Sequence, residues 1–233
     1  KYYDLETTAQ SKEEKYKYNS LLEMIIPVVK TYPSEAGSYS VNNGLQVLGG
    51  YGFCSDFILQ QYYRDIRISA IYEGTTGIQS QDLLGRKITM NNGDGLKLLL
   101  SEISDTISKA NKNSELKPYA DSLSEKIAMC DKILKSLMPH ALKGDFEKYL
   151  ADASVFMEFF SLIILGWNWL EIASNSADTI NRSEKSFSNE FYSSKIETMK
   201  YFFEYELPKT MGYYQIIMNP SSVTIKKEKE ILF

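Results

Sequence analysis

One carboxylate in this sequence stands where it could act as a base. Glu73 lies in the run Ile71-Tyr72-Glu73-Gly74, between apolar residues and a glycine that frees the backbone. Apolar surroundings raise the pKa of a carboxyl group, and such a group can take a proton from a weak carbon acid. Taken alone, the same pattern also fits a capping glutamate in an ordinary turn.

The residues that follow this carboxylate suit a polar or anionic ligand. Thr75 and Thr76 offer hydroxyl and backbone N–H groups at the expected start of a helix over 76–87. A helix N-terminus carries unpaired N–H groups and the positive end of the helix dipole. We therefore expect this turn to present hydrogen-bond donors to a cofactor or a substrate.

A second candidate is the glycine turn at 49–53, which reads Gly-Gly-Tyr-Gly-Phe. Three glycines in four positions stop the preceding helix and allow a close approach to the backbone. A basic and acidic cluster follows at Arg64, Asp65 and Arg67. All of the specific features in the chain therefore fall between residues 46 and 87.

The composition excludes several other kinds of site. The only histidine, His140, and the two cysteines, Cys54 and Cys130, have no metal-ligand or redox spacing, so no metal site is expected. We expect His140 to be an ordinary residue near a helix end and both thiols to be free. A net charge of −4 gives no broad basic face for nucleic acid.

The chain has no visible secretory leader, and its most apolar stretch, 155–173, is long enough to cross a bilayer. Glu158, Asn168 and Glu171 interrupt that stretch at a high cost in hydrocarbon. We expect a buried core helix, no membrane span and a cytoplasmic protein. The aromatic residues expected to pack in a core or a subunit interface, and not in a ligand groove, are Phe156, Phe159, Phe160, Trp167 and Trp169.

The elements that must position these residues are helices. Apolar residues recur at helical spacing throughout, which predicts an all-α chain. Pro33 is expected to end a first helix over 12–31, because the residue before a proline avoids the helical region. Further helices are predicted over 34–48, 56–66 and 76–87.

The turn-forming run at 89–95 predicts a linker, and we expect one unit over 1–90 and another over 91–233. Four amphipathic stretches follow the linker and predict a four-helix domain. A surface loop is expected at 174–186, and Pro208 is expected to kink the last helix.

The order of these motifs resembles the C-terminal domain of the acyl-CoA dehydrogenases. The residues that follow Gly77 and the length of the second half of the chain are similar to those of a subgroup with an appended helical domain. This subgroup includes the 3-methylmercaptopropionyl-CoA dehydrogenase-like proteins. The matching runs are LLEMIIPVVKTYPSEAG (21–37), QVLGGYGF (46–53), YYRDIRI (62–68), IYEGTTGIQ (71–79) and DLLGRK (82–87).

The resemblance implies α,β-dehydrogenation of an acyl-CoA thioester. Glu73 matches the catalytic glutamate, which takes the α proton while the β hydrogen leaves as hydride to FAD. The backbone N–H of Glu73 would help to bind the thioester oxygen, and Gly74 would leave room for acyl-CoA. The full-length enzyme is expected to be a homo-oligomer that passes electrons to an electron-transfer flavoprotein.

The same resemblance assigns the flavin contacts. Thr75, Thr76 and Gly77 match positions that touch FAD. The residues that match the segment in contact with the FAD of a neighbouring subunit are Gln46, Gly49 and Gly50.

Three further positions are interpreted through the family pattern. Arg64 and Asp65 match a charge pair that we expect to fix the loop carrying Glu73. Gln61 stands where the common family signature has a basic residue. This difference weakens the match to the generic family signature more than the match to the subgroup. Arg67 is left open.

The family fold also has an N-terminal helical domain and a middle β domain, which have no counterpart here. We therefore expect a C-terminal fragment that is inactive alone and does not hold FAD tightly. Two alternatives stay open: a stand-alone helical interaction module, and a DNA-associated relative of the alkylation-response flavoproteins. DNA binding by such a relative would require a continuous basic face, whereas the clustered lysines are only Lys226, Lys227 and Lys229.

Overall fold

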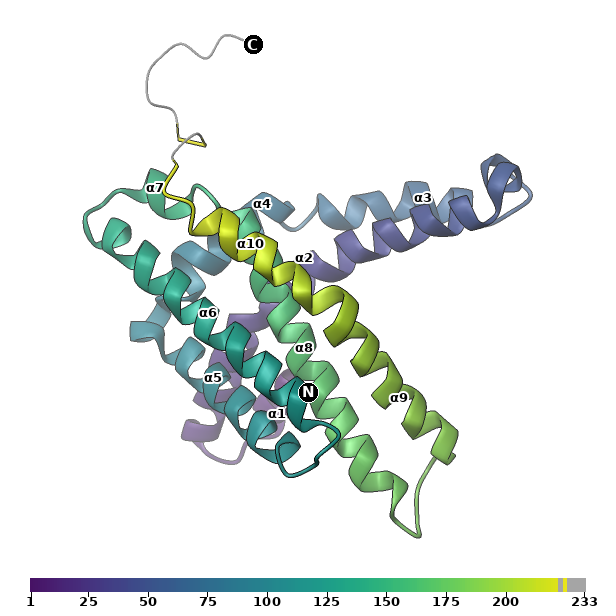
Figure 1. Ribbon diagram of the computed structural model, residues 1–233. Coiled ribbons are helices and arrows are strands. Elements are labelled where there is room, and N and C mark those ends of the chain that lie inside the picture. Colours follow the sequence, from purple (N-terminus) through teal and green to yellow (C-terminus); the bar gives the residue numbers. More distant parts are fainter. Residues whose placement is uncertain (222–223, 226–233) are drawn as a thin grey trace. The chain divides into compact units, whose positions relative to one another are not determined.

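The structure is a computed structural model that describes residues 1–221 and 224–225, and over these residues it contains helices and no strand (Figure 1). This confirms the all-α prediction. The chain divides into two compact units, Lys1–Gly95 and Leu96–Phe233. The three lysines of the C-terminal cluster, Lys226, Lys227 and Lys229, lie outside the described residues.

One long helix organises the first unit. α1 (Tyr2–Thr8) leads into α2 (Lys12–Val47), which spans 36 residues. A capping box starts α2: the Ser11 side chain accepts from the Glu14 N–H, and the Glu14 carboxylate accepts from the Ser11 N–H. The other helical elements of this unit pack along α2.

The prediction that Pro33 ends a helix is wrong, because α2 continues through both Pro27 and Pro33. Proline fixes a φ that is itself helical, so its cost lies in the missing N–H and the clash with the preceding turn. Pro27 is buried, and the Ser34 hydroxyl donates to the carbonyl of Thr31 at 2.8 Å. Packing along the whole helix therefore outweighs the local preference of the sequence.

α3 (Leu59–Ile66) lies antiparallel against the C-terminal half of α2, and the two run side by side in Figure 1. Two glycines on α2, seven residues apart, make this close packing possible. A Cβ at Gly37 would lie 2.8 Å from Ile66 Cδ1, and one at Gly44 would lie 3.0 Å from Leu59 Cδ1. A side chain at either glycine would therefore require the end of the Ile66 or Leu59 side chain to move.

Shorter elements complete the first unit. A 3-10 turn (Gly49–Phe53) joins α2 to α3, and another (Arg67–Ala70) follows α3. α4 (Thr76–Asp82) is shorter than predicted, because the helix widens into a π-helical turn over Leu83–Lys87. The buried apolar residues of this unit are Tyr2, Leu21, Met24, Val28, Ala70, Leu83, Leu84 and Ile88.

The predicted linker at 89–95 contains a left-handed turn. α5 (Met90–Ala110) opens with Asn91, Asn92 and Gly93 at φ +51°, +56° and +76°. Asparagine and glycine are the residues that adopt this conformation most readily, since one has a short polar side chain and the other none. Regular helix therefore begins only after this turn.

The second unit is built from long helices. Besides α5 it contains α6 (Lys117–Leu142), α7 (Phe146–Leu150), α8 (Ala153–Ile180), α9 (Asn189–Tyr201) and α10 (Thr210–Ile217). α8 packs against α6, α9 and α10.

α8 forms the core of this unit. It is long and apolar enough to cross a membrane by length and composition, but 67% of its most apolar window is buried inside the structure, as in the core helix of a soluble protein. Phe156, Phe159, Phe160 and Trp167 are at most 3% exposed and pack in the core, as predicted, whereas Trp169 is half-buried.

The predicted loop at 174–186 is wrong in its first half, because α8 continues to Ile180 and buries Ser174 and Ser176. Small serine side chains fit a helix interface despite their polarity. The expected break at Pro208 is confirmed: a π-helical turn and a 3-10 turn separate α9 from α10, and the proline lies in the second of them.

Candidate functional site

Glu73 lies in the loop between α3 and α4, in a backbone conformation that side chains rarely adopt. Its φ is +55°, and the φ of Gly74 is +93°. A left-handed glutamate is a strained residue, and such strain persists only where surrounding contacts hold it. The loop contacts are therefore part of the site.

Two side chains bind the backbone of this loop directly. Lys30 on α2 donates from Nζ to the carbonyl O of Gly74 at 2.5 Å. Gln79 on α4 donates from Nε2 to the carbonyl O of Glu73 at 3.0 Å. Both carbonyls beside the strained residue are thus occupied by side-chain donors.

A third contact holds the far end of the loop. The hydroxyl of Thr76, the first residue of α4, donates to Oε1 of Glu35 at 2.5 Å. Glu35 also lies on α2, five residues after Lys30. Because the hydroxyl proton of Thr76 is donated to Glu35, the predicted cofactor contact of Thr76 would come from its backbone N–H or from its hydroxyl oxygen as an acceptor.

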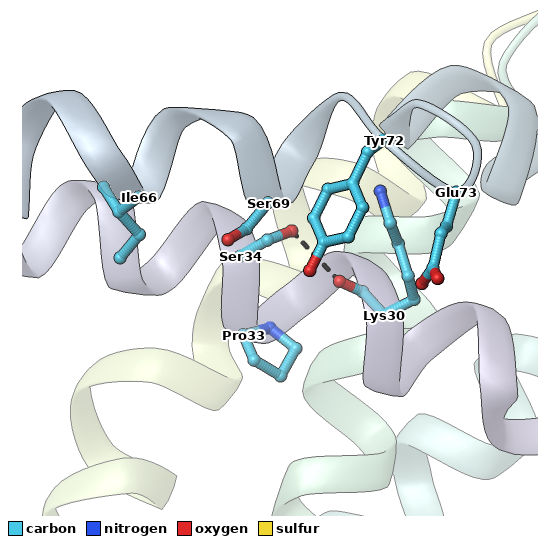
Figure 2. A pocket seen from close by; sticks show the side chains of 7 residues that line it. All are labelled: Lys30, Pro33, Ser34, Ile66, Ser69, Tyr72 and Glu73. Carbon is cyan, nitrogen blue, oxygen red and sulfur yellow. Dashed lines mark hydrogen bonds between the residues drawn. The ribbon is translucent and has the colours of Figure 1, made fainter.

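A hollow of about 300 Å³ opens beside Glu73. Figure 2 shows the Lys30 side chain reaching from α2 toward the loop, and the Glu73 side chain extending from the loop toward α2. This volume is at the lower end of small-molecule sites, enough for part of a ligand. Its lining residues are Lys30, Pro33, Ser34, Ile66, Ser69, Tyr72 and Glu73.

The apolar enclosure expected around Glu73 is not formed by the described residues of this chain. Ile71 is 48% exposed and Tyr72 is 52% exposed, and Glu73 itself is exposed. The loop thus presents its carboxylate at an open surface. An apolar environment for it would have to come from another domain or another chain.

The glycine turn at the end of α2 is equally open. A Cβ at Gly49 or Gly50 would meet nothing within 4 Å, and both residues are exposed, as is Gln46. Gly52 is different, because a Cβ there would lie 2.3 Å from the carbonyl O of Leu45. The turn therefore has one glycine that packing requires and two whose backbone a ligand can approach.

The structure does not bring the two predicted groups together. Lys30, beside the Glu73 loop, and Gln46, near the glycine turn, are sixteen residues apart on one helix, which corresponds to about 24 Å. Thr75 and Gly77 lie with the Glu73 loop and are exposed. Each group would contact a separate ligand or a separate part of a long one.

The predicted charge pair between Arg64 and Asp65 is absent from the described part of the chain. Arg64 donates instead to Oε1 of Gln60, one turn earlier on α3, at 2.5 Å. Gln61, where the signature has a basic residue, is exposed. Arg67 lines a second hollow of about 400 Å³ on the hairpin of α2 and α3, together with Ser38, Tyr39, Asn42, Tyr63 and Ile66.

No group of three or more histidine, cysteine or acidic side chains able to hold a metal occurs among residues 1–221 and 224–225. His140 lies in the last turn of α6, as expected, with Nδ1 3.2 Å from Oδ2 of Asp145. Both cysteines are free, Cys54 exposed and Cys130 buried.

Lys30 and Glu35 are the functional candidates that the sequence reasoning missed. The sequence pattern predicts a helix end before Pro33 and a new start at Ser34 and Glu35, and it assigns no role to Lys30. The available signal was weak: two charged residues beside an apolar run of a helix, with no indication of what lies opposite them.

Comparison with known proteins identifies both halves of the chain. Residues 5–88 match the family described as acyl-CoA dehydrogenase, C-terminal domain. Residues 99–226 match the family described as acetyl-CoA dehydrogenase C-terminal like.

Several characterised relatives match most of the chain. A broad-specificity linear acyl-CoA dehydrogenase of Mycobacterium tuberculosis is 27% identical over 84% of the chain. A butyryl-CoA dehydrogenase of Syntrophomonas wolfei is 27% identical over 91%, and a 3-methylmercaptopropionyl-CoA dehydrogenase of Ruegeria pomeroyi is 28% identical over 82%.

These alignments cover 33%, 34% and 32% of the three relatives, so the chain spans about a third of the length of the curated relatives it matches. The identities are nearly equal although the named substrates differ, so the subgroup is not resolved. Taken together with the helical fold, the two family matches show that the chain belongs to the acyl-CoA dehydrogenase family and contains its C-terminal helical domain followed by the C-terminal-like domain.

Proposed function

We propose that this chain is the C-terminal third of a flavin-dependent acyl-CoA dehydrogenase, in which Glu73 removes the α proton of an acyl-CoA thioester. The observation that supports this most is the loop itself. Glu73 is held in a left-handed conformation by contacts to its own carbonyl and to that of Gly74. Strain maintained around one exposed carboxylate is typical of functional sites.

The proposed reaction removes one proton and one hydride from the acyl-CoA. The carboxylate of Glu73 would take the α proton, and the β hydrogen would leave as hydride, for which FAD would supply the acceptor, so that a double bond forms between the α and β carbons. The Glu73 N–H donates to the thioester oxygen and stabilises the charge that develops there. The adjacent Gly74 has no side chain to obstruct the acyl-CoA.

The residues assigned to FAD fit a close approach of a large cofactor. A Cβ at Gly49, Gly50 or Gly77 would meet nothing within 4 Å, so the backbone at each position is open. Thr75 is exposed beside Gly77. The distance along α2 between this pair and the group of Gln46, Gly49 and Gly50 supports contacts to two flavins in a homo-oligomer.

The remaining parts of the proposal follow from family membership. The complete enzyme would pass its electrons to an electron-transfer flavoprotein and obtain the walls of its acyl pocket from parts beyond this chain. Its cytoplasmic location is a separate proposal, which rests on the sequence and not on the family. The second unit resembles the appended helical domain of the longer members, and its four long helical stretches are its main point of similarity.

The experiment is the replacement Glu73→Gln in the complete enzyme, which keeps the backbone N–H and the shape and removes the base. Flavin reduction by acyl-CoA, followed by stopped-flow absorbance, should slow by about 10²-fold or more, while FAD content is retained. Glu13→Gln, at an exposed site in the first turn of α2, is the matched control and should react like the wild type. Flavin reduction at the wild-type rate in Glu73→Gln would show that this carboxylate is not the base.

A further inference from the structure

We propose that Lys30 and Glu35 are positioning residues that set the geometry of Glu73, an inference that rests on the proposed role of Glu73 as the base. The two residues lie on one helix, α2, and bind the loop on either side of Thr75. Neither residue was singled out by the motifs of the sequence.

The Lys30 contact acts on the backbone and not on the catalytic side chain. Its ammonium group donates to the carbonyl O of Gly74 at 2.5 Å across 44 residues of sequence. This carbonyl belongs to the peptide between Gly74 and Thr75, so the bond holds Gly74, the residue next to Glu73, while the bond from Gln79 to the carbonyl O of Glu73 holds the peptide between them. A charged donor to a carbonyl is stronger than a neutral one, which suits it to holding a strained residue.

The Glu35 contact fixes the other end of the loop. Its carboxylate accepts from the hydroxyl of Thr76 at 2.5 Å, and this bond is partly buried. Thr76 begins α4, so the bond also determines where that helix starts. The segment from Gly74 to Thr76, directly after Glu73, is thus held at both ends by side chains of a single helix.

Catalysis by a positioned base is sensitive to small displacements, and a misplacement of about 1 Å can cost on the order of a hundredfold in rate. The geometry therefore predicts that weakening either contact lowers kcat and leaves acyl-CoA binding nearly unchanged. A residue needed only for folding would lower the amount of active enzyme without changing the rate per bound flavin.

The first measurement uses the 233-residue chain and does not depend on any activity. Lys30→Met keeps the apolar stem and removes the donor. Amide hydrogen exchange of α4 (Thr76–Asp82), whose Gln79 N–H donates to the carbonyl O of Thr75, is followed by mass spectrometry; it should accelerate about tenfold or more, while that of α8 is unchanged. Lys15→Met, an exposed lysine on the same helix, is the matched control. Wild-type exchange in Lys30→Met would overturn the proposal.

The second measurement uses the complete enzyme. Lys30→Met should reduce the rate of flavin reduction per bound FAD by about tenfold or more with KM within about twofold, and Lys30→Arg, which still donates, should recover part of the rate. Glu35→Gln, which keeps an acceptor oxygen, should reduce the rate of flavin reduction less than Glu35→Ala does. A loosened loop with an unchanged rate would overturn the positioning role.

The two proposals fail separately. If Glu73→Gln reduces its flavin at the wild-type rate, the proposed function is wrong, while hydrogen exchange still shows whether Lys30 and Glu35 hold the loop. If Glu73→Gln abolishes the reaction but Lys30→Met and Glu35→Ala react at the wild-type rate, Glu73 is the base and the positioning role of Lys30 and Glu35 is wrong.

Discussion

Lys87 is only 3% exposed, and its ammonium group pairs with the carboxylate of Glu23 on α2. The lysine comes from the π-helical turn that ends the first family match, so the pair ties this turn back to the central helix. The Glu23 side chain is 34% exposed, so water reaches one partner and not the other. The two partners should therefore respond differently to removal.

Glu23→Ala is expected to lower the free energy of unfolding of the first unit by about 3 kcal/mol, because it leaves a buried ammonium group without its counter-ion. Lys87→Met removes the buried charge itself and should cost less than about 1 kcal/mol. Trp167 and Trp169 both lie in the second unit. Tryptophan fluorescence therefore follows only the second unit, and a circular-dichroism transition in urea that fluorescence does not follow reports the unfolding of the first unit. Equal losses of unfolding free energy in Glu23→Ala and Lys87→Met would contradict this account.

Gly52→Ala should destabilise the first unit by about 2 kcal/mol or more, since the new Cβ would lie 2.3 Å from the carbonyl O of Leu45 and a backbone atom cannot give way easily. Gly50→Ala, two residues away in open space, is the matched control and should stay within about 0.5 kcal/mol of the wild type. Urea unfolding measures both. A Gly52→Ala protein as stable as Gly50→Ala would show that the turn relaxes.

Stability should fall in alkali through Cys130. Burial and the charge of Asp131 raise the pKa of this thiol from 9.0 to about 12. Between pH 9 and pH 12 the unfolded chain loses the thiol proton that the folded chain keeps, so the free energy of unfolding falls as pH rises, by at most about 1.4 kcal/mol per unit. Cys130→Ala should flatten this decline in urea unfolding measured at several pH values, and an unchanged slope would refute the assignment.

The isolated chain should self-associate and should not retain FAD. Val47, Tyr51 and Phe53, at the end of α2 and in the turn that follows it, are 87%, 70% and 96% exposed, and such apolar surfaces bind other surfaces. Light scattering should show association that Val47→Ser with Phe53→Ser reduces, whereas Leu142→Ser, at an 84% exposed residue of the second unit, should not. A monomer at all concentrations, or a yellow protein, would contradict this prediction.

Much of the fold could be predicted from the sequence because the signals were local. Apolar periodicity indicated the helical class, and Asn91, Asn92 and Gly93 marked the turn between the units because they adopt left-handed φ readily. The break at Pro208 was also predicted, because proline has no backbone N–H and clashes with the preceding helical turn. A π-helical turn and a 3-10 turn replace the regular helix there.

What the sequence could not predict depends on residues far apart in the chain. Pro33 resembles a helix end, but packing of α3 and α4 against α2 keeps the helix continuous. The same holds for the candidate site: the motif around Glu73 was visible, whereas the contacts of Lys30 and Glu35 join residues 44 and 41 apart. Arg64 found its partner within one helical turn, at Gln60, and not in the adjacent Asp65.

The seven-residue spacing of Gly37 and Gly44 on α2 has a consequence for the order of folding. Gly44 and Leu59 are fifteen residues apart, whereas Lys30 and Gly74 are 44 apart, so closing the second contact directly costs about 1 kcal/mol more in chain entropy. Packing of α3 onto α2 first, with Ile66 against Gly37, leaves only the eight residues from Ile66 to Gly74 to be closed. We therefore expect the loop of Glu73 to dock last when the unit folds and to detach first when it opens.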